Sequence, residues 1–119
     1  MESQKICSID VVLTYLGKKW SLHIIRDLFQ GKKRFNEFLR KNKNLSSKVL
    51  AERLKELEEN KIINKKIVST RPVLIEYELT KKGRSLDKLM KELADFAHEN
   101  CSQNNKVCTC NIEINNLNL

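Results

Sequence analysis

The 119-residue sequence contains little of what membrane proteins, secreted domains and phosphate-binding enzymes depend on. Its longest apolar runs are only a few residues, whereas a membrane-spanning helix needs about 20. With three glycines in the chain, there is no glycine-rich loop that could cradle a phosphate. The first ten residues, MESQKICSID, lack the apolar core of a signal peptide. We therefore expect a cytoplasmic protein with no membrane partner.

Catalytic residue combinations are also missing from the sequence. There are only two histidines, His23 and His98, and neither has a serine, cysteine or carboxylate at a spacing that would support nucleophilic or acid–base catalysis. We predict that the protein is not an enzyme and that it needs no cofactor.

Positive charge is what the chain has in excess. Lysine and arginine together number 23 against 15 acidic residues, which gives a net charge of +8 and a pI near 9.4. This balance indicates a polyanionic partner, with nucleic acid the first choice, although a lysine-rich solvated surface would have the same composition. The length fits one domain, which can bury roughly two thirds of its unfolded surface without help from disulfides.

The first 60 residues have helical periodicity. We expect a helix at 8–16, capped by Ser8 and ended by Gly17, and a second at 18–29 that is apolar nearly all round and therefore central to the core. A short helix at 34–40 and a polar link precede a fourth helix at 46–60. In this fourth helix Ser46 is the predicted cap, and the buried stripe consists of Leu50, Leu54 and Leu57.

From Lys61 onward the pattern first becomes strand-like. Two β-rich segments predict a hairpin whose tip includes Ser69, Thr70, Arg71 and Pro72. Thr80 then caps a long helix at 81–100 with an apolar stripe. This order predicts a mainly α fold with a small β-hairpin wing, an α+β winged helix-turn-helix. The domain would span residues 1–100, including its first and last helices as dimerisation helices, with a cysteine- and asparagine-containing tail at 101–119.

Three stretches carry a resemblance to a known family. They are GKKWSLHIIRDLFQGKKRFNEFLRK at 17–41, LSSKVLAERLKELEENKII at 45–63 and RPVLIEYELTKKGRSL at 71–86. Over about residues 7–97 the chain resembles the HxlR-type branch of MarR-like winged helix-turn-helix transcription regulators. The resemblance implies a homodimer that acts on DNA. Two positions depart from the family: Lys61 replaces a usual glycine, so we expect Asn60 to take the left-handed cap, and Phe96 replaces a frequent tryptophan.

The fourth helix is the one that the resemblance identifies as the recognition helix, yet it contains more acidic than basic residues. Helix-turn-helix proteins read bases mainly with the first residues of this helix, in the major groove. We interpret Glu56, Glu58 and Glu59 as a solvated face beyond the groove. The predicted base-reading residues of helix 46–60 are Ser46, Ser47, Lys48, Ala51, Glu52 and Lys55.

The positive charge lies in the flanks of this helix. Residues 32–43 contain six basic residues against one acidic residue, and residues 61–75 contain four against none. Phosphate contacts position a protein, whereas base contacts discriminate between sequences. We therefore predict that the flanks supply affinity and the helix supplies selectivity. The wing would contact the backbone or the minor groove. The predicted flanking contacts are Lys32, Lys33, Arg34, Lys65, Lys66, Ser69, Thr70 and Arg71.

The apolar stripe of helix 81–100 is longer than one small domain needs. With the first helix it predicts a homodimer interface, and a twofold dimer would bind double-stranded DNA with a pseudo-palindromic operator whose half-sites lie about 34–36 Å apart. The alternative is a last helix that packs only within its own chain.

Four cysteines leave several readings open. The resembled family carries a cysteine at the position of Cys7, and in some members that residue senses oxidants. If residues 107–114 form a strand, Cys108 and Cys110 share a face with two isoleucines and act as small apolar residues. The sharper hypothesis is a zinc or iron–sulfur site on Cys7, Cys101, Cys108 and Cys110. A disulfide that involves Cys7 or Cys101 is a further alternative. The alternative function is a thiol or metal sensor module whose winged helix contacts other proteins.

Overall fold

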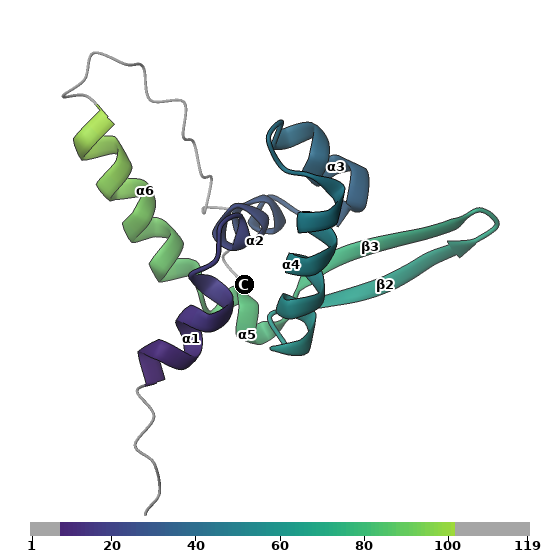
Figure 1. Cartoon of the computed structure of the whole chain (residues 1–119), viewed down its shortest axis with the longest axis horizontal. Helices are drawn as coiled ribbons and strands as arrows, with labels where there is room; N and C mark the ends of the chain where they lie inside the picture. Colours follow the sequence, from purple (N-terminus) through teal and green to yellow (C-terminus); the bar gives the residue numbers. More distant parts are fainter. Residues whose placement is uncertain (1–7, 102–119) are drawn as a thin grey trace, which may run out of the picture.

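The structure is a computed structural model that describes residues 8–101. A helical body occupies its centre, and the hairpin and the last helix project from it in opposite directions (Figure 1). Along the chain the elements are α1 (Ser8–Leu16), α2 (Ser21–Phe29), β1 (Lys33–Arg34), α3 (Phe35–Lys41), α4 (Ser47–Glu59), β2 (Ile63–Thr70), β3 (Val73–Leu79), α5 (Lys81–Arg84) and α6 (Asp87–Cys101). No helix in these residues is long and apolar enough to cross a membrane.

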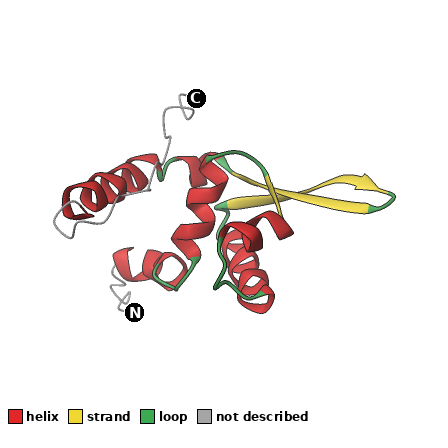
Figure 2. Cartoon of the chain, turned by 90° about the horizontal axis from the view of Figure 1, so that it is seen from above, coloured by secondary structure: helices red, strands yellow, loops and turns green. Residues whose placement is uncertain are grey.

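The sheet has three antiparallel strands in the order β1-β3-β2. The β2–β3 hairpin was predicted and forms a long ribbon that stands clear of the helices (Figure 2). The short β1 was not predicted. It pairs with β3 only through Lys33 with Tyr77 and Arg34 with Glu76. It stops there because Arg34 also precedes the first turn of α3, where its backbone N–H donates to Glu37 Oε1 at 3.0 Å.

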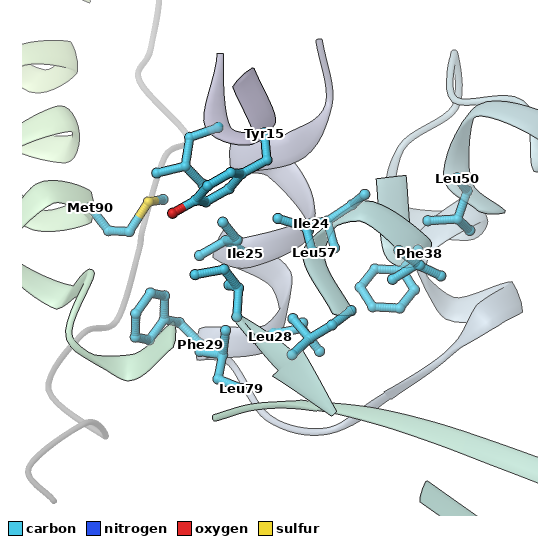
Figure 3. Packing of buried hydrophobic residues seen from close by; sticks show 14 of the residues in the cluster. Tyr15, Ile24, Ile25, Leu28, Phe29, Phe38, Leu50, Leu57, Leu79 and Met90 are labelled. Atoms are coloured by element: carbon cyan, nitrogen blue, oxygen red, sulfur yellow. The ribbon is translucent and has the colours of Figure 1, made fainter. Parts of the chain in front are cut away.

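One hydrophobic core joins α1, α2, α3, α4 and α6 to the base of the wing. Side chains from α1, α2, α3, α4, β3 and α6 meet in it (Figure 3). The central helix is α2, as predicted, because four of its apolar side chains are buried. The fully or nearly fully buried members include Ile24, Ile25, Phe38, Leu50, Leu57, Ile62 and Ile63.

The prediction for the fourth helix is confirmed in detail. Ser46 caps α4, and its hydroxyl accepts a hydrogen bond from the Val49 backbone N–H at 3.1 Å. Leu50, Leu54 and Leu57 are at most 2% exposed and fix the face that α4 turns to the core. The face of α4 opposite these leucines therefore points away from the core.

Two predicted helices have different bounds in the structure. The helix expected at 18–29 begins only at Ser21, because Trp20 adopts a left-handed conformation with φ 82° and interrupts it. The helix expected at 81–100 is divided into α5 and α6. A Cβ on Gly83 would lie 2.2 Å from the Ile62 carbonyl oxygen, so α5 is held against the start of the wing, and α6 leaves in a new direction.

The two ends of the wing also differ from prediction. Lys61 itself takes the left-handed conformation, with φ 63°, whereas Asn60 has φ −89°. The expectation for Asn60 is wrong because the bond that closes the helix runs from the Ile62 N–H to the Leu57 carbonyl, which places the left-handed position one residue later. At the other end, Ser69 and Thr70 belong to β2, so the tip is only Arg71 and Pro72.

Candidate nucleic-acid interface

The outward face of α4 contains the residues that the sequence indicated. Lys48, Ala51, Glu52 and Lys55 are exposed, together with Ser46 and Ser47 at the helix start. Within residues 8–101 no ion pair engages Lys48 or Lys55, and Glu52 reaches Arg53 only at 3.9 Å. The Ser46 hydroxyl oxygen already caps the helix. The first turns of α4 thus offer one uncommitted ammonium group and small side chains that permit close approach.

The acidic end of α4 differs from the prediction at Glu56, whereas Glu59 is exposed as predicted. Glu56 is not a solvated carboxylate. It forms ion pairs with Lys18, from the turn between α1 and α2, and with Arg53 Nη1 at 3.1 Å. Arg53 Nε also donates to the Lys19 carbonyl at 2.9 Å. The Arg53–Glu56 pair has the i, i+3 spacing of one helical face, whereas Lys18 and Lys19 are distant in sequence, so helical spacing alone could not reveal their contacts with α4.

Glu58 lies near the wing. Its charge and, more strongly, burial of the phenol raise the pKa of Tyr77 above its usual value of 10.0. Both residues line a groove of about 670 Å³ between α4 and β2. Three lysines line it as well, namely Lys55, Lys61 and Lys65.

The wing presents basic and aliphatic side chains together. Lys65, Lys66, Thr70 and Arg71 are exposed, whereas Ser69 is half-buried. The outer half of the hairpin also exposes Ile67, Val68 and Val73. These aliphatic residues were not predicted to be exposed. Their position next to the predicted hairpin tip was the signal that could have found them, because the outer half of a hairpin has no core to cover it.

The basic residues before α3 are only partly free. Lys32 Nζ lies 3.7 Å from Glu78 Oε2 on β3, Lys33 is half-buried in β1, and Arg34 is exposed. Farther along, Lys41 contacts Gln30 and lies 3.6 Å from the buried Asp27 carboxylate. The positive flank at 32–43 therefore holds fewer unpaired cations than its composition suggested.

A buried polar cluster that was not predicted joins α2 to the end of α3. Asp27 is fully buried. Its carboxylate accepts from Arg26 at 3.1 and 3.2 Å and from the buried Asn42 Nδ2 at 2.8 Å. Asn42 Nδ2 also donates to the Phe38 carbonyl at 2.9 Å, which ends α3. The lone acid in the apolar helix 18–29 was the available signal, because a buried carboxylate requires partners.

The outer helices carry an apolar surface that the domain leaves uncovered. Of the ten large hydrophobic side chains that are exposed in the described part of the chain, seven lie on α1 and α6. A groove of about 380 Å³ runs between these helices and the start of α2. His23 lines it 4.7 Å from the Trp20 ring, and burial lowers the pKa of His23 below 6.5, assisted by the charge of Arg26. The exposed residues are Ile9, Val11, Val12, Leu13, Leu89, Leu93 and Phe96.

The cysteine hypotheses fall mostly outside the described residues. Cys7, Cys108 and Cys110 lie there, as does the strand predicted at 107–114, and Cys101 is the last residue of α6. Between residues 8 and 101, no three histidine, cysteine or acidic side chains are placed to hold a metal ion.

The three-helix core, the capped α4 with its outward face, and the projecting hairpin together define a winged helix-turn-helix protein. Comparison with known proteins agrees, because a model of the HxlR-like helix-turn-helix family matches residues 15–105. The chain belongs to the HxlR-like helix-turn-helix family. It is a transcriptional regulator of the helix-turn-helix type.

Its relatives are regulators of similar length. The HTH-type transcriptional regulator YodB of Bacillus subtilis (strain 168) is 38% identical over 100 residues, which cover 84% of this chain and 89% of YodB. A solved structure of YodB in its reduced form superimposes with a TM-score of 0.69 over 81% of this chain and 95% of that one. The structure of the redox regulator HypR in its oxidised form gives a TM-score of 0.75 at 31% identity, over 79% of this chain and 97% of HypR.

Proposed function

We propose that this regulator is a homodimer that binds a pseudo-palindromic operator in double-stranded DNA. The exposed first turns of α4 read base edges in the major groove, and the wing contacts the backbone or the minor groove. The observation that carries this proposal is the division of α4. Its leucine face is buried and its Arg53 and Glu56 are engaged by the α1–α2 turn, while Lys48 and Lys55 remain without an ion-pair partner in the described chain.

The roles of the remaining cations follow from their positions. Lys65 and Lys66 on β2 and Arg71 at the tip would neutralise phosphates, with Ser69 and Thr70 beside them. Lys32, Lys33 and Arg34 before α3 would contribute similar contacts. Such contacts raise affinity for every sequence alike, whereas Lys48, Ala51 and Glu52 would set the preference between sequences.

The dimer is proposed from the apolar surfaces of α1 and α6. Exposed aliphatic and aromatic side chains on two adjacent helices would be costly in a monomer. A second copy related by a twofold axis would cover both helices at once. Replacing Leu93, which lines the groove, with glutamate should shift sedimentation toward the monomer, whereas the same change at Lys91 on the exposed face should not.

The test of DNA binding has two arms. Operator fragments are first selected from random duplexes, and affinity is then measured over a salt series. We expect the logarithm of affinity to fall linearly with that of salt, with a slope of about −0.9 per phosphate neutralised. The Lys66→Gln variant should weaken all duplexes and reduce the slope by about one. The Lys48→Gln variant should change which sequence is preferred. Salt-independent binding, or none, would refute the proposal.

Thiol-dependent control is proposed as part of this function. Two relatives of known structure are described as redox regulator HypR and as YodB in its reduced form. Operator affinity would therefore differ between the reduced and the diamide-treated protein, with Cys7 the first candidate and Cys101, Cys108 and Cys110 the others. A Cys7→Ser variant that still responds would move the role to the tail. Zinc or iron bound in stoichiometric amounts, and lost in Cys108→Ser, would instead favour a metal site.

A further inference from the structure

A second groove follows the other edge of the wing. The groove beside α4 lies along β2, whereas this one lies between α3 and the outer part of β3, and its volume is about 390 Å³. In Figure 1 α3 lies on the β3 side of the hairpin. The lining residues are Arg34, Phe35, Asn36, Arg40, Val73, Leu74 and Ile75.

The strand that forms one wall of this groove has an unpaired edge. Along β3, β1 pairs only with Tyr77 and Glu76, because the chain turns into α3 directly after Arg34. The outer residues Val73, Leu74 and Ile75 pair with β2 on one edge alone. In the described part of the chain, no other backbone segment bonds to them. A free strand edge is a template for another strand unless something covers it.

The side chains around the edge suit an extended peptide. Val73 is 64% exposed, and Ile75 and Phe35 are half-buried in the same groove. On the neighbouring strand, Ile67 is 62% exposed. Contacts to DNA phosphates come from basic and polar groups, so they do not account for these aliphatic residues. Alternating pockets along a strand edge give side-chain specificity when a peptide adds to a sheet.

The positive charge of the groove favours acidic peptides over basic ones. Two arginines line it, Arg34 and Arg40, and no acidic residue does. Both are exposed, and neither guanidinium forms an ion pair among residues 8–101. Carboxylates on the incoming strand would complement them, since an arginine and a carboxylate form charge-assisted hydrogen bonds.

We propose that the outer edge of β3 binds a short, extended, acidic segment of a partner protein by strand addition, with alternate apolar side chains against Val73 and Phe35 and carboxylates against Arg40. Three free residues span about 10 Å at 3.3 Å per residue, so the segment is short. This site goes beyond DNA binding and uses an edge of the wing that the operator-reading face of α4 does not.

The experiment uses fluorescence anisotropy with the full chain. The probe is a labelled synthetic octapeptide of alternating valine and glutamate. Two further probes are an octapeptide of alternating valine and lysine, and the acidic peptide N-methylated at every second residue. We expect the acidic peptide to bind and both others to bind at least about tenfold more weakly, because they lose the charge match or the backbone hydrogen bonds.

Substitutions test whether the peptide binds in the groove beside β3. Arg40→Glu should weaken binding of the acidic peptide about tenfold, and Arg40→Gln less. The matched control Arg84→Glu, at an exposed side chain of α5, should leave binding unchanged. Arg34 is not used, because it also belongs to the proposed DNA contacts. Circular dichroism tests whether each variant is folded. If Arg40→Glu does not fold, the conclusion rests on Arg40→Gln.

Three results with the peptides would overturn the proposal. They are no binding of the acidic peptide, equal binding of the N-methylated peptide, and no effect of either Arg40 variant. Duplex affinity is measured separately with the same proteins. If Arg40→Glu weakens duplex binding as much as Lys66→Glu does, the groove belongs to the DNA surface and the peptide site is wrong. Loss of operator binding by the unaltered protein would count against the proposed function alone.

Discussion

The buried carboxylate of Asp27 should be one of the most sensitive positions for stability. Replacing it with alanine leaves the Asn42 amide without its 2.8 Å acceptor and removes the acceptor of two Arg26 hydrogen bonds. The cluster joins α2 to the end of α3. The change would therefore loosen the turn that sets the position of α4.

The size of the effect follows from how deeply each partner is buried. Removing one partner of a buried ion pair costs about 3–5 kcal/mol. Here the Arg26 and Lys41 side chains are 29% and 37% exposed, so water can solvate their charges after the change. We therefore expect the lower end, about 3 kcal/mol, which for a domain of this size lowers Tm by about 12 °C or more.

The assay is denaturant unfolding followed by circular dichroism. Protein concentration is held fixed, because the stability of the proposed homodimer would depend on it. Asp27→Ala, Asn42→Ala and the double variant form a cycle. The hydrogen bond between them involves a charged acceptor, so we expect a coupling of about 1.5–3 kcal/mol. The control is Asp95→Ala on the exposed side of α6, which should change stability by less than about 0.5 kcal/mol.

Two outcomes would refute this reasoning. If Asp27→Ala were as stable as Asp95→Ala, the buried cluster would not contribute to folding. If the cycle showed no coupling, Asp27 and Asn42 would act through separate contacts, and the turn would be held by apolar packing alone.

Three further predictions concern other parts of the fold. Lys61→Gly should stabilise the protein by about 1 kcal/mol, because it relieves a left-handed lysine at the cost of some unfolded-state entropy; calorimetry showing destabilisation would contradict this. Gly83→Ala should destabilise by about 2 kcal/mol or more, since its Cβ would meet the Ile62 carbonyl oxygen at 2.2 Å, and an unchanged melting curve would contradict this. The lowered pKa of His23 means that the unfolded state binds more protons just below pH 6.5, so stability should fall as pH decreases through that window. His23→Gln should flatten this dependence in unfolding experiments between pH 5 and pH 7.

Local patterns predicted the parts of the fold that depend on them. Ser46 and the three leucines after it specified α4, and the alternation before Leu79 specified the hairpin. The short β1 was not predictable in this way, because two residues carry no periodicity and their pairing depends on where α3 begins. The break between α5 and α6 depends on a close approach of Gly83 to Ile62, which is a contact between distant segments.

The candidate interface shows the same limit. Exposure of Lys48, Ala51, Glu52 and Lys55 follows from helical geometry once the leucine face is known, and the structure confirms it. The contact of Glu56 with Lys18 could not be predicted, because Lys18 lies 38 residues earlier in the chain. Composition overstated the positive flank at 32–43 for the same reason, since Lys32 and Lys41 have partners that only the tertiary structure brings close.

The division of α4 bears on how such a regulator can acquire a new target. The residues that hold the helix in place, Arg53 and Glu56 with the leucines, are different from those that face outward at Lys48, Ala51 and Lys55. Substitutions at the outward positions disturb no ion pair of the described fold. A gene duplicate could therefore change at these few positions and keep its fold. Under the proposed reading of DNA by α4, operator preference would then diverge faster among relatives than the architecture that presents it.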